Sequence, residues 1–197
     1  MNTQSHMLMG AVLYGRSDPR LLRASMVGGL IPDVPMILIF GTLKEAGFSD
    51  RAIFGRLFFE NWWQIANAIG HSFLLWGGLV GLAFWLRKRD AWAGAGALLA
   101  LSAAALTHSV VDFLCHREDA HMHFWPLSRW KFVSPVSYYD PAHYGTYFAI
   151  FEAVLGLAMA AILIRRIRNG WGRLFILLLA LPYLAVPAYF AFHRSFG

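Results

Sequence analysis

Charged residues are scarce in this sequence: 14% of its 197 residues are Asp, Glu, Lys or Arg, whereas 58% are hydrophobic. A typical soluble domain carries about 25% charged residues and has a polar face on each surface helix. Residues 91–106 offer only Ser102 for such a face. Together with a mean hydropathy of +0.50, this scarcity argues against a soluble globular protein and for a membrane protein.

Cysteine and linker sequence are also nearly absent. Cys115 is the one cysteine, so no intramolecular disulfide can form. The first residues have no positively charged segment before a hydrophobic run, so we expect no cleaved signal peptide. The sequence has no internal repeat, low-complexity linker or shift in composition. We therefore predict a single membrane-embedded domain over residues 1–197, in which residues 1–152 contain the functional site.

Long apolar runs are abundant instead, and five approach the ~20 residues that a bilayer core requires. They are residues 24–43, 61–86, 91–111, 141–164 and 174–193. The fold predicted is an all-α integral membrane bundle of about five apolar helices. The segment before Arg16 is too short to cross and predicts a short N-terminal helix, and the aromatic residues between Phe54 and Trp63 predict an interfacial helix.

The distribution of arginine and lysine predicts the orientation. Basic residues gather in three short connections, at residues 16–23, 87–89 and 165–173. Because basic loops favour the cytoplasmic side, we expect these connections inside and the long connection 116–144 outside a bacterial-type inner membrane. The short basic clusters beside apolar runs indicate membrane lipid as the partner and give no indication of nucleic acid.

Several polar residues lie within the apolar runs, where a central charge costs at least ~2.5 kcal/mol and needs a partner. Asp33 is bracketed by Pro32 and Pro35, which interrupt regular helix. His108 and Asp112 are four residues apart and share a helical face. His108, Asp112, His71 and His116 all fall near the predicted outer ends of their helices. The orientation that predicts this rests on the arginines and lysines alone, so the two patterns support each other.

Imidazoles and carboxylates together are the usual ligands of zinc, iron or manganese, and one or two divalent ions would offset these buried acids. His116, His121 and His123 are candidates for additional ligands, and Glu152 is an intramembrane acid that could be a ligand, a general base or the partner of an arginine. The alternative is that Asp33 and Asp112 pair with histidines or arginines and simply join helices.

The segments SHMLMG, GGLIPD, GHS, THSVVD and FWPLSRWKF, in this order, resemble the YdjM-type membrane-bound metal-dependent hydrolases over about residues 5–152. The resemblance implies that the metal ligands are His6, Asp33, His71, His108 and Asp112, and that Glu152 matches an acid that follows the WP motif. Two positions depart from the pattern, because Pro35 replaces an aspartate and a motif histidine would fall near Ala66. This protein would then hold fewer ions, or hold them differently.

The order of His, Asp, His and HxxxD is also similar, more distantly, to the zinc-dependent phospholipase C and single-strand nuclease superfamily. These resemblances imply a membrane-embedded hydrolase of a phosphoester in a lipid or lipid-linked substrate. Asp33, Asp112 and Glu152 are its candidate catalytic residues, and Asp112 would bridge to a second ion bound by His6. Arg117, Arg129 and Lys131 are candidates for binding the phosphate.

Two other functional classes stay open. A metal site closed by protein ligands would favour a metal-stabilised scaffold or an ion carrier, because a catalytic metal keeps one position for water. The departures at Pro35 and near Ala66 are also compatible with a partner-binding subunit whose ligands are vestigial. The sequence does not identify the oligomeric state.

Overall fold

The computed structural model describes residues 1–15 and 18–185 of the chain. Over these residues it is helical and contains no β-strand. Four helical stretches are long and apolar enough to cross a membrane: Pro19–Glu45, Asn61–Lys88, Ala95–Cys115 and Gly145–Arg166. The predicted all-α bundle is therefore confirmed. The fifth predicted span, residues 174–193, lies partly outside the described residues.

The first long stretch is broken at its centre. It consists of α2 (Pro19–Leu30), a 3-10 turn (Ile31–Asp33) and α3 (Val34–Glu45). Pro32 lies inside this turn and Pro35 follows it, so two backbone donors are missing from the helical hydrogen-bond ladder. The break brings the side chain of Asp33 into the bundle midway along an otherwise apolar stretch.

The second long stretch is broken as well, between α5 (Asn61–Gly70) and α6 (Phe73–Lys88). His71 ends α5, and the hydroxyl of Ser72 caps α6 by accepting a hydrogen bond from the amide of Leu75 at 3.2 Å. His71 therefore lies at a break, as Asp33 does, whereas α7 (Ala95–Cys115) and α8 (Gly145–Arg166) run without interruption.

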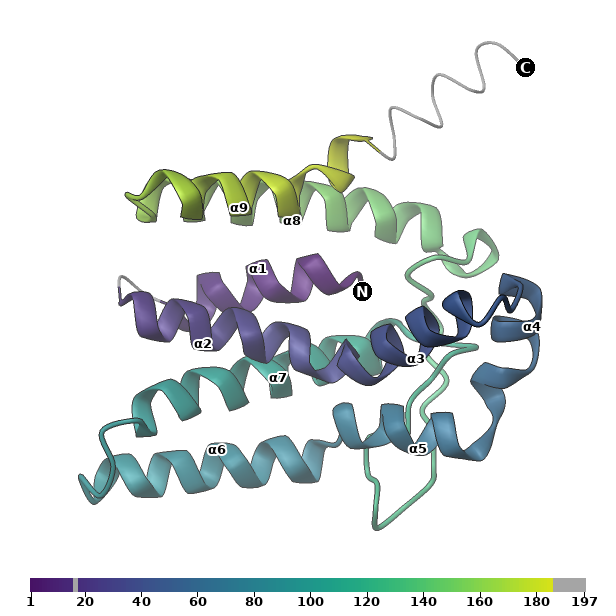
Figure 1. Cartoon of the computed structure of the whole chain (residues 1–197), viewed down its shortest axis with the longest axis horizontal. Coiled ribbons are helices and arrows are strands. Elements are labelled where there is room, and N and C mark those ends of the chain that lie inside the picture. The colour runs from purple at the N-terminus through teal and green to yellow at the C-terminus, as the bar shows by residue number, and fades with distance from the viewer. Residues whose placement is uncertain (16–17, 186–197) are drawn as a thin grey trace.

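The predicted N-terminal helix is present as α1 (Thr3–Tyr14), which packs against α2, α7 and α8 near the middle of the bundle (Figure 1). Its contact with α2 is close, because a Cβ atom added to Gly29 would lie 2.5 Å from the carbonyl oxygen of His6. Only glycine allows this approach. It brings the polar side chains of α1 to the same level as the breaks.

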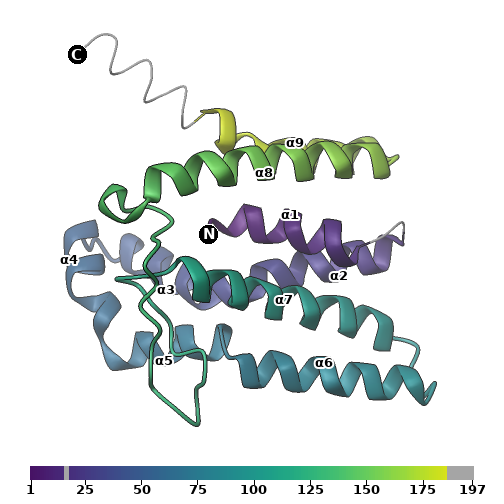
Figure 2. The same cartoon turned by 180° about the vertical axis from the view of Figure 1, so that it is seen from behind.

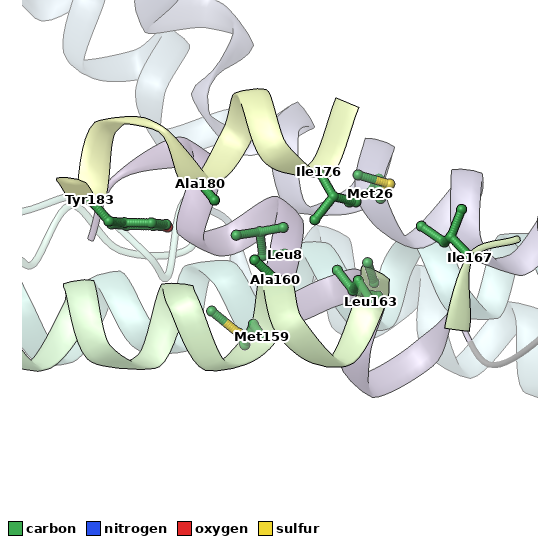
Figure 3. Close-up of a cluster of buried hydrophobic side chains, with 10 residues drawn as sticks. Leu8, Met26, Met159, Ala160, Leu163, Ile167, Ile176, Ala180 and Tyr183 are labelled. Carbon is green, nitrogen blue, oxygen red and sulfur yellow. The ribbon is translucent and has the colours of Figure 1, made fainter. Parts of the chain in front are cut away.

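The main apolar core joins α1 to α8 and to α9 (Gly170–Ala180) (Figure 3). Leu8 of α1, Leu163 of α8 and Ile176 of α9 are fully buried there. A smaller cluster of Ile53, Phe58 and Trp63 joins α4 (Asp50–Gly55) to the start of α5. Residues of the predicted interfacial helix thus form α4, a 3-10 turn (Leu57–Phe59) and the first turn of α5.

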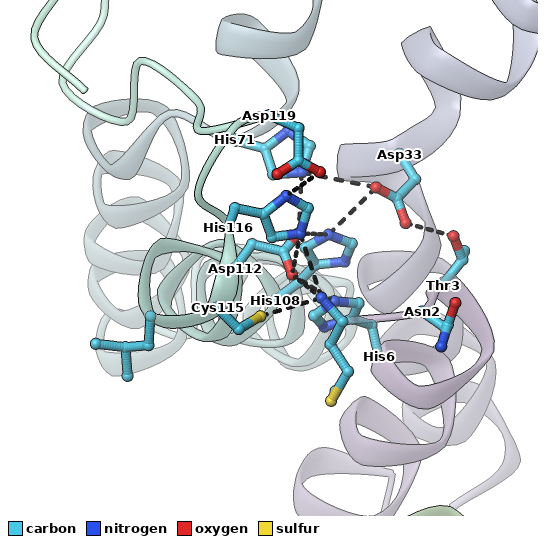
Figure 4. A network of polar contacts seen from close by, with 12 residues as sticks. Asn2, Thr3, His6, Asp33, His71, His108, Asp112, Cys115, His116 and Asp119 are labelled. Carbon is cyan, nitrogen blue, oxygen red and sulfur yellow. Dashed lines mark hydrogen bonds and ion pairs between the residues drawn. The ribbon is translucent and has the colours of Figure 1, made fainter. Parts of the chain in front are cut away.

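The two ends of the bundle differ in composition and structure (Figures 1 and 2). At one end lie the three basic connections, between α1 and α2, α6 and α7, and α8 and α9. At the other end lie α4, the start of α1 and the long irregular connection from α7 to α8. The polar residues of the start of α1, of both breaks and of the end of α7 lie close together (Figure 4).

Candidate metal centre

Four side chains from three parts of the chain converge beside the start of α1 (Figure 4). They are Asp33 from the break before α3, His71 from the end of α5, and His108 and Asp112 from successive turns of α7. One potential ligand atom from each lies within 4.8 Å of all the others. His71, His108 and Asp112 are fully buried, and the side chain of Asp33 is 13% exposed.

The distances between these atoms fit a metal ion better than they fit hydrogen bonds. The Nε2 atoms of His71 and His108 lie 3.3 and 3.0 Å from one oxygen of Asp112, and 3.6 and 3.5 Å from one oxygen of Asp33. The two longer distances exceed those of normal hydrogen bonds. Two ligands of a tetrahedral zinc ion, each about 2.0–2.1 Å from the metal, lie about 3.3–3.4 Å apart. The four nitrogen-to-oxygen distances given above lie on either side of this value.

Both histidines are oriented by their other ring nitrogen. The Nδ1 atom of His71 contacts the carbonyl oxygen of Asn67 at 2.9 Å, and that of His108 contacts the carbonyl oxygen of Gly29 at 2.8 Å. A carbonyl only accepts, so each Nδ1 carries a proton, and the neutral form of each ring would present the lone pair of Nε2 to a metal ion. Neither buried Nε2 has a hydrogen-bond partner among the described residues. The donor set therefore fits a divalent metal ion.

The second oxygen of Asp112 faces a different group of residues. The Nε2 atoms of His6 and His116 lie 2.8 and 3.3 Å from it, and the ring of His6 stacks on that of His108 with centroids 3.5 Å apart. The amino group of Met1 lies 2.8 Å from this oxygen and 3.2 Å from the sulfur of Cys115. Asp112, Cys115 and His116 form a second group that could hold a cation.

Two residues of the long connection extend this second group. Asp119 contacts the Nδ1 atom of His116 at 2.9 Å, and the ring of His121 stacks on that of His71 with centroids 3.9 Å apart. Burial works against the charged form of His116, but Asp112 and Asp119 more than offset it and raise the pKa of His116. Burial, then His71 and His116, hold the pKa of His121 well below its usual value, so His121 is neutral.

A cavity of about 430 Å³ opens beside this cluster. Its polar side is formed by Asp33, His116, Glu118, Asp119, His121, Tyr138 and Tyr139, together with Asn2 and Thr3. Its apolar side is formed by Met36, Ile37, Phe54, Phe58 and Phe59. Of the four converging side chains only Asp33 lines this cavity, so Asp33 separates the buried cluster from the cavity.

Three basic residues predicted to bind phosphate do not line this cavity. Arg117 donates to the carbonyl of Ser134 at 3.0 Å, Arg129 to Asn61 at 3.3 Å and Lys131 to Gln64 at 2.5 Å. Their predicted role stays a prediction.

His123, a predicted additional ligand, is uncharged. Burial, and then the neighbouring His71, lower the pKa of His123 to about 3, and its Nδ1 contacts the carbonyl of His121 at 3.1 Å.

Glu152 belongs to neither ligand group. One of its oxygens accepts hydrogen bonds from the amide of Asn2 at 2.7 Å and the hydroxyl of Ser5 at 2.5 Å. Its other oxygen accepts a hydrogen bond from the side-chain amide of Asn2 at 2.9 Å. These bonds fasten the start of α1 to α8, and the predicted catalytic role of Glu152 stays a prediction.

No protein-family model, curated protein or solved structure matches this chain. The resemblance to the YdjM-type hydrolases therefore stays a prediction. What the fold and site define is an all-α bundle, with four helices able to span a membrane and a buried His/Asp cluster able to hold a metal ion. Sequence reasoning missed Cys115, at the end of α7, and Asp119 and Tyr138, in the long connection from α7 to α8.

Proposed function

We propose that this protein is a membrane-embedded, metal-dependent hydrolase that cleaves a phosphoester of a lipid or lipid-linked substrate. One observation carries the proposal. Buried imidazole and carboxylate groups, including ring nitrogens without a hydrogen-bond partner among the described residues, lie beside a cavity lined by both polar and apolar side chains. A metal centre beside an amphipathic cavity suits a substrate with a charged headgroup and an apolar chain.

Asp33, His71, His108 and Asp112 would hold one divalent ion, most simply zinc, with iron or manganese as alternatives for the same nitrogen and oxygen donors. His6 and His116, on the other oxygen of Asp112, would contribute to a second. When bound, such an ion supplies Lewis acidity and activates water for attack on phosphorus.

The remaining polar side of the cavity would orient the phosphate. Burial raises the pKa of Tyr138, so its hydroxyl keeps its proton and can donate to a phosphate oxygen. The neutral ring of His121 offers another hydrogen-bonding nitrogen, while Glu118 and Asp119 repel an anion. An acid-lined cavity accepts a phosphoester only when cations offset these charges, which explains why a metal-dependent reaction is proposed.

The apolar side of the cavity supports a lipid substrate. Ile37, Phe54 and Phe59 line the cavity and remain 46%, 42% and 55% exposed. Within a bilayer such side chains face acyl chains, so a lipid could reach the polar side laterally. The three basic connections lie at the opposite end of the bundle (Figure 1), which supports an extracytoplasmic site in an inner membrane.

The second candidate is a metal site without catalysis. It is favoured by the first ligand group itself, because this group offers four protein atoms, which is as many as a structural zinc ion takes. Hydrolysis requires a position for water, and the partly exposed Asp33 marks the side on which that position would lie. The two candidate functions therefore use the same metal site. They differ in whether water and substrate can reach the metal from the cavity.

The test combines metal analysis with hydrolysis. Protein purified in detergent is analysed for bound elements and assayed with short-chain phospholipids, before and after chelation and after return of zinc or manganese. His108→Ala removes one ligand. Ser109→Ala is the matched control, because this neighbouring buried hydroxyl contacts only the carbonyl of Ala105 within its own helix.

We expect wild type and Ser109→Ala to contain stoichiometric metal and to release product, and we expect His108→Ala to do neither. Stoichiometric metal without hydrolysis of any phosphoester would establish the non-catalytic site instead. A wild-type protein that binds no metal after reconstitution would overturn both candidates.

A further inference from the structure

A second groove lies at the basic end of the bundle, away from the metal centre. Its volume is about 600 Å³, and it is formed by the end of α1, the start of α2, the end of α6 and the first turns of α7. Leu13, Leu21 and Leu99 give it apolar walls, while Tyr14 and Trp92 add two aromatic rings. The proposed hydrolase does not use this groove.

Two arginines from different helices line this groove. Arg20 comes from α2 and Arg87 from α6. Neither side chain forms an ion pair or a hydrogen bond with any other residue in the ranges 1–15 and 18–185. Two guanidinium groups facing one groove form a recognised arrangement for phosphate, since each presents a planar fork of donors.

The groove also contains two acids. Asp18 is already engaged, because it caps α2 by accepting from the amide of Arg20 at 2.7 Å. Asp90 lies in the turn after α6, and its carboxylate has no ion-pair partner among the described residues. Around them the charge is strongly positive: residues 18–23, 87–90 and 165–173 contain nine arginines and lysines and two aspartates. Binding of an anion at this end would reduce that mutual repulsion.

The depth of the groove identifies the source of the anion. It lies where the apolar stretches Asn61–Lys88 and Ala95–Cys115 end and begin, which is where a bilayer places its headgroups. Trp92 is 53% exposed and Tyr14 is half-buried, as for aromatic residues at a membrane interface. Leu13, one of the leucines that line the groove, is also 53% exposed.

We infer that this groove binds one membrane phospholipid, with the headgroup phosphate between Arg20 and Arg87 and an acyl chain along the leucines. Asp90 lies at the rim of the same groove and would favour a headgroup that also carries an ammonium or hydroxyl group. The bound lipid would be a structural ligand of the bundle, distinct from a substrate at the metal centre.

Native mass spectrometry of the full chain in detergent tests this inference. Dioleoyl phosphatidylglycerol, dioleoyl phosphatidylethanolamine or inorganic phosphate is added to wild type and to Arg20→Gln/Arg87→Gln. The matched control is Arg165→Gln/Arg168→Gln, which removes two exposed arginines from the same end but not from the groove. Both double variants lose the same charge, so only the place of the arginines differs.

We expect wild type and the control to retain one lipid per chain, and the groove variant to bind it at least tenfold more weakly. Equal weakening in both variants would overturn the site, because it would indicate attraction to the basic surface alone. Inorganic phosphate that displaces the lipid at similar concentration would overturn the lipid assignment. A single Arg87→Gln variant replaces the double variant if the latter fails to fold, and unchanged binding in it would also count against the site.

Discussion

Two buried acids in this bundle have opposite surroundings. Glu152 is surrounded by hydrogen-bond donors, since Asn2 and Ser5 contribute three bonds to its carboxylate. Asp112 is surrounded mainly by imidazole nitrogens, two of which have no hydrogen-bond partner among the described residues. The carboxylate of Glu152 is therefore satisfied by donors. Asp112 pairs through one oxygen with the amino group of Met1 and with His6, and through its other oxygen it belongs to a cluster that could hold a metal ion.

This difference separates an acid that joins two helices through hydrogen bonds from a candidate metal ligand, even though both residues look alike in the sequence. Each lies in an apolar helix, and each would be costly without a partner. What distinguishes them is the neighbour on α1: Ser5 presents a hydroxyl to Glu152, whereas His6 presents a ring nitrogen to Asp112. Two consecutive residues of one helix thus serve two different sites.

Of the variants that test this comparison of Asp112 with Glu152, Asp112→Asn has the largest expected effect, which is on metal content. The substituted amide would keep the shape of the side chain but lose the charge and one of the two acceptor oxygens that the ligand groups share. We expect bound metal to fall from stoichiometric to below about 0.1 ion per chain, because a neutral amide is a poor ligand for zinc. Elemental analysis measures this, and retention of full metal content would contradict the assignment.

Gly29→Ala tests whether the site depends on the close contact of α1 with α2. The new Cβ atom would lie 2.5 Å from the carbonyl of His6, so the two helices must separate. We expect unfolding free energy to fall by about 1–3 kcal/mol, and metal binding to weaken because the carbonyl of Gly29 orients His108. Thermal unfolding in detergent and metal titration provide the two measurements.

Gly78→Ala is the control, because the space around Gly78 on α6 is open. There a methyl group should leave metal binding unchanged and raise stability by up to about 1 kcal/mol through helix propensity. Equal behaviour of the two variants would show that the contact at Gly29 does not position the site.

The sequence was sufficient for the fold class and for most of the candidate ligands, for a physical reason. Apolar length predicts spans directly, and a histidine or acid inside a span is conspicuous because it is costly. His6, Asp33, His71, His108 and Asp112 were found in this way and by the family resemblance, and all five lie together in the structure.

The contacts of Asp119, His121 and Tyr138 were missed because these residues belong to the long connection, whose irregular path has no periodicity. Nothing in residues 116–144 predicts that Asp119 returns to His116, or that His121 stacks on His71, because irregular backbone carries no repeating signal. The contacts of Arg117, Arg129 and Lys131 were equally unpredictable: Arg117 contacts the carbonyl of Ser134 and pairs with Glu118, while Arg129 and Lys131 donate to the side chains of Asn61 and Gln64.

Glu152→Gln tests the other half of the comparison between Asp112 and Glu152, namely that Glu152 serves stability and not metal binding. A glutamine has one acceptor oxygen, so at least one donor from Asn2 or Ser5 would face an amide NH₂ group. We expect a loss of about 1.5–3 kcal/mol in unfolding free energy, the usual value for hydrogen bonds to a charged group, with metal content unchanged. A stable variant that keeps its metal but loses hydrolysis would instead support the catalytic role predicted from the sequence.

Asp119→Asn has the smallest expected effect and tests whether the two ligand groups of the metal centre bind separate ions. Asp119 contacts only His116 of the candidate ligands, and His116 faces the oxygen of Asp112 that points away from His71 and His108. Loss of such an orienting carboxylate typically weakens metal binding 10- to 100-fold. We expect a weakening of about tenfold for the second ion and none for the first, measured by competition with a metal chelator. A single class of ion with unchanged affinity would exclude His116 as a ligand, whereas equal weakening of two ions would mean that both groups act as one site.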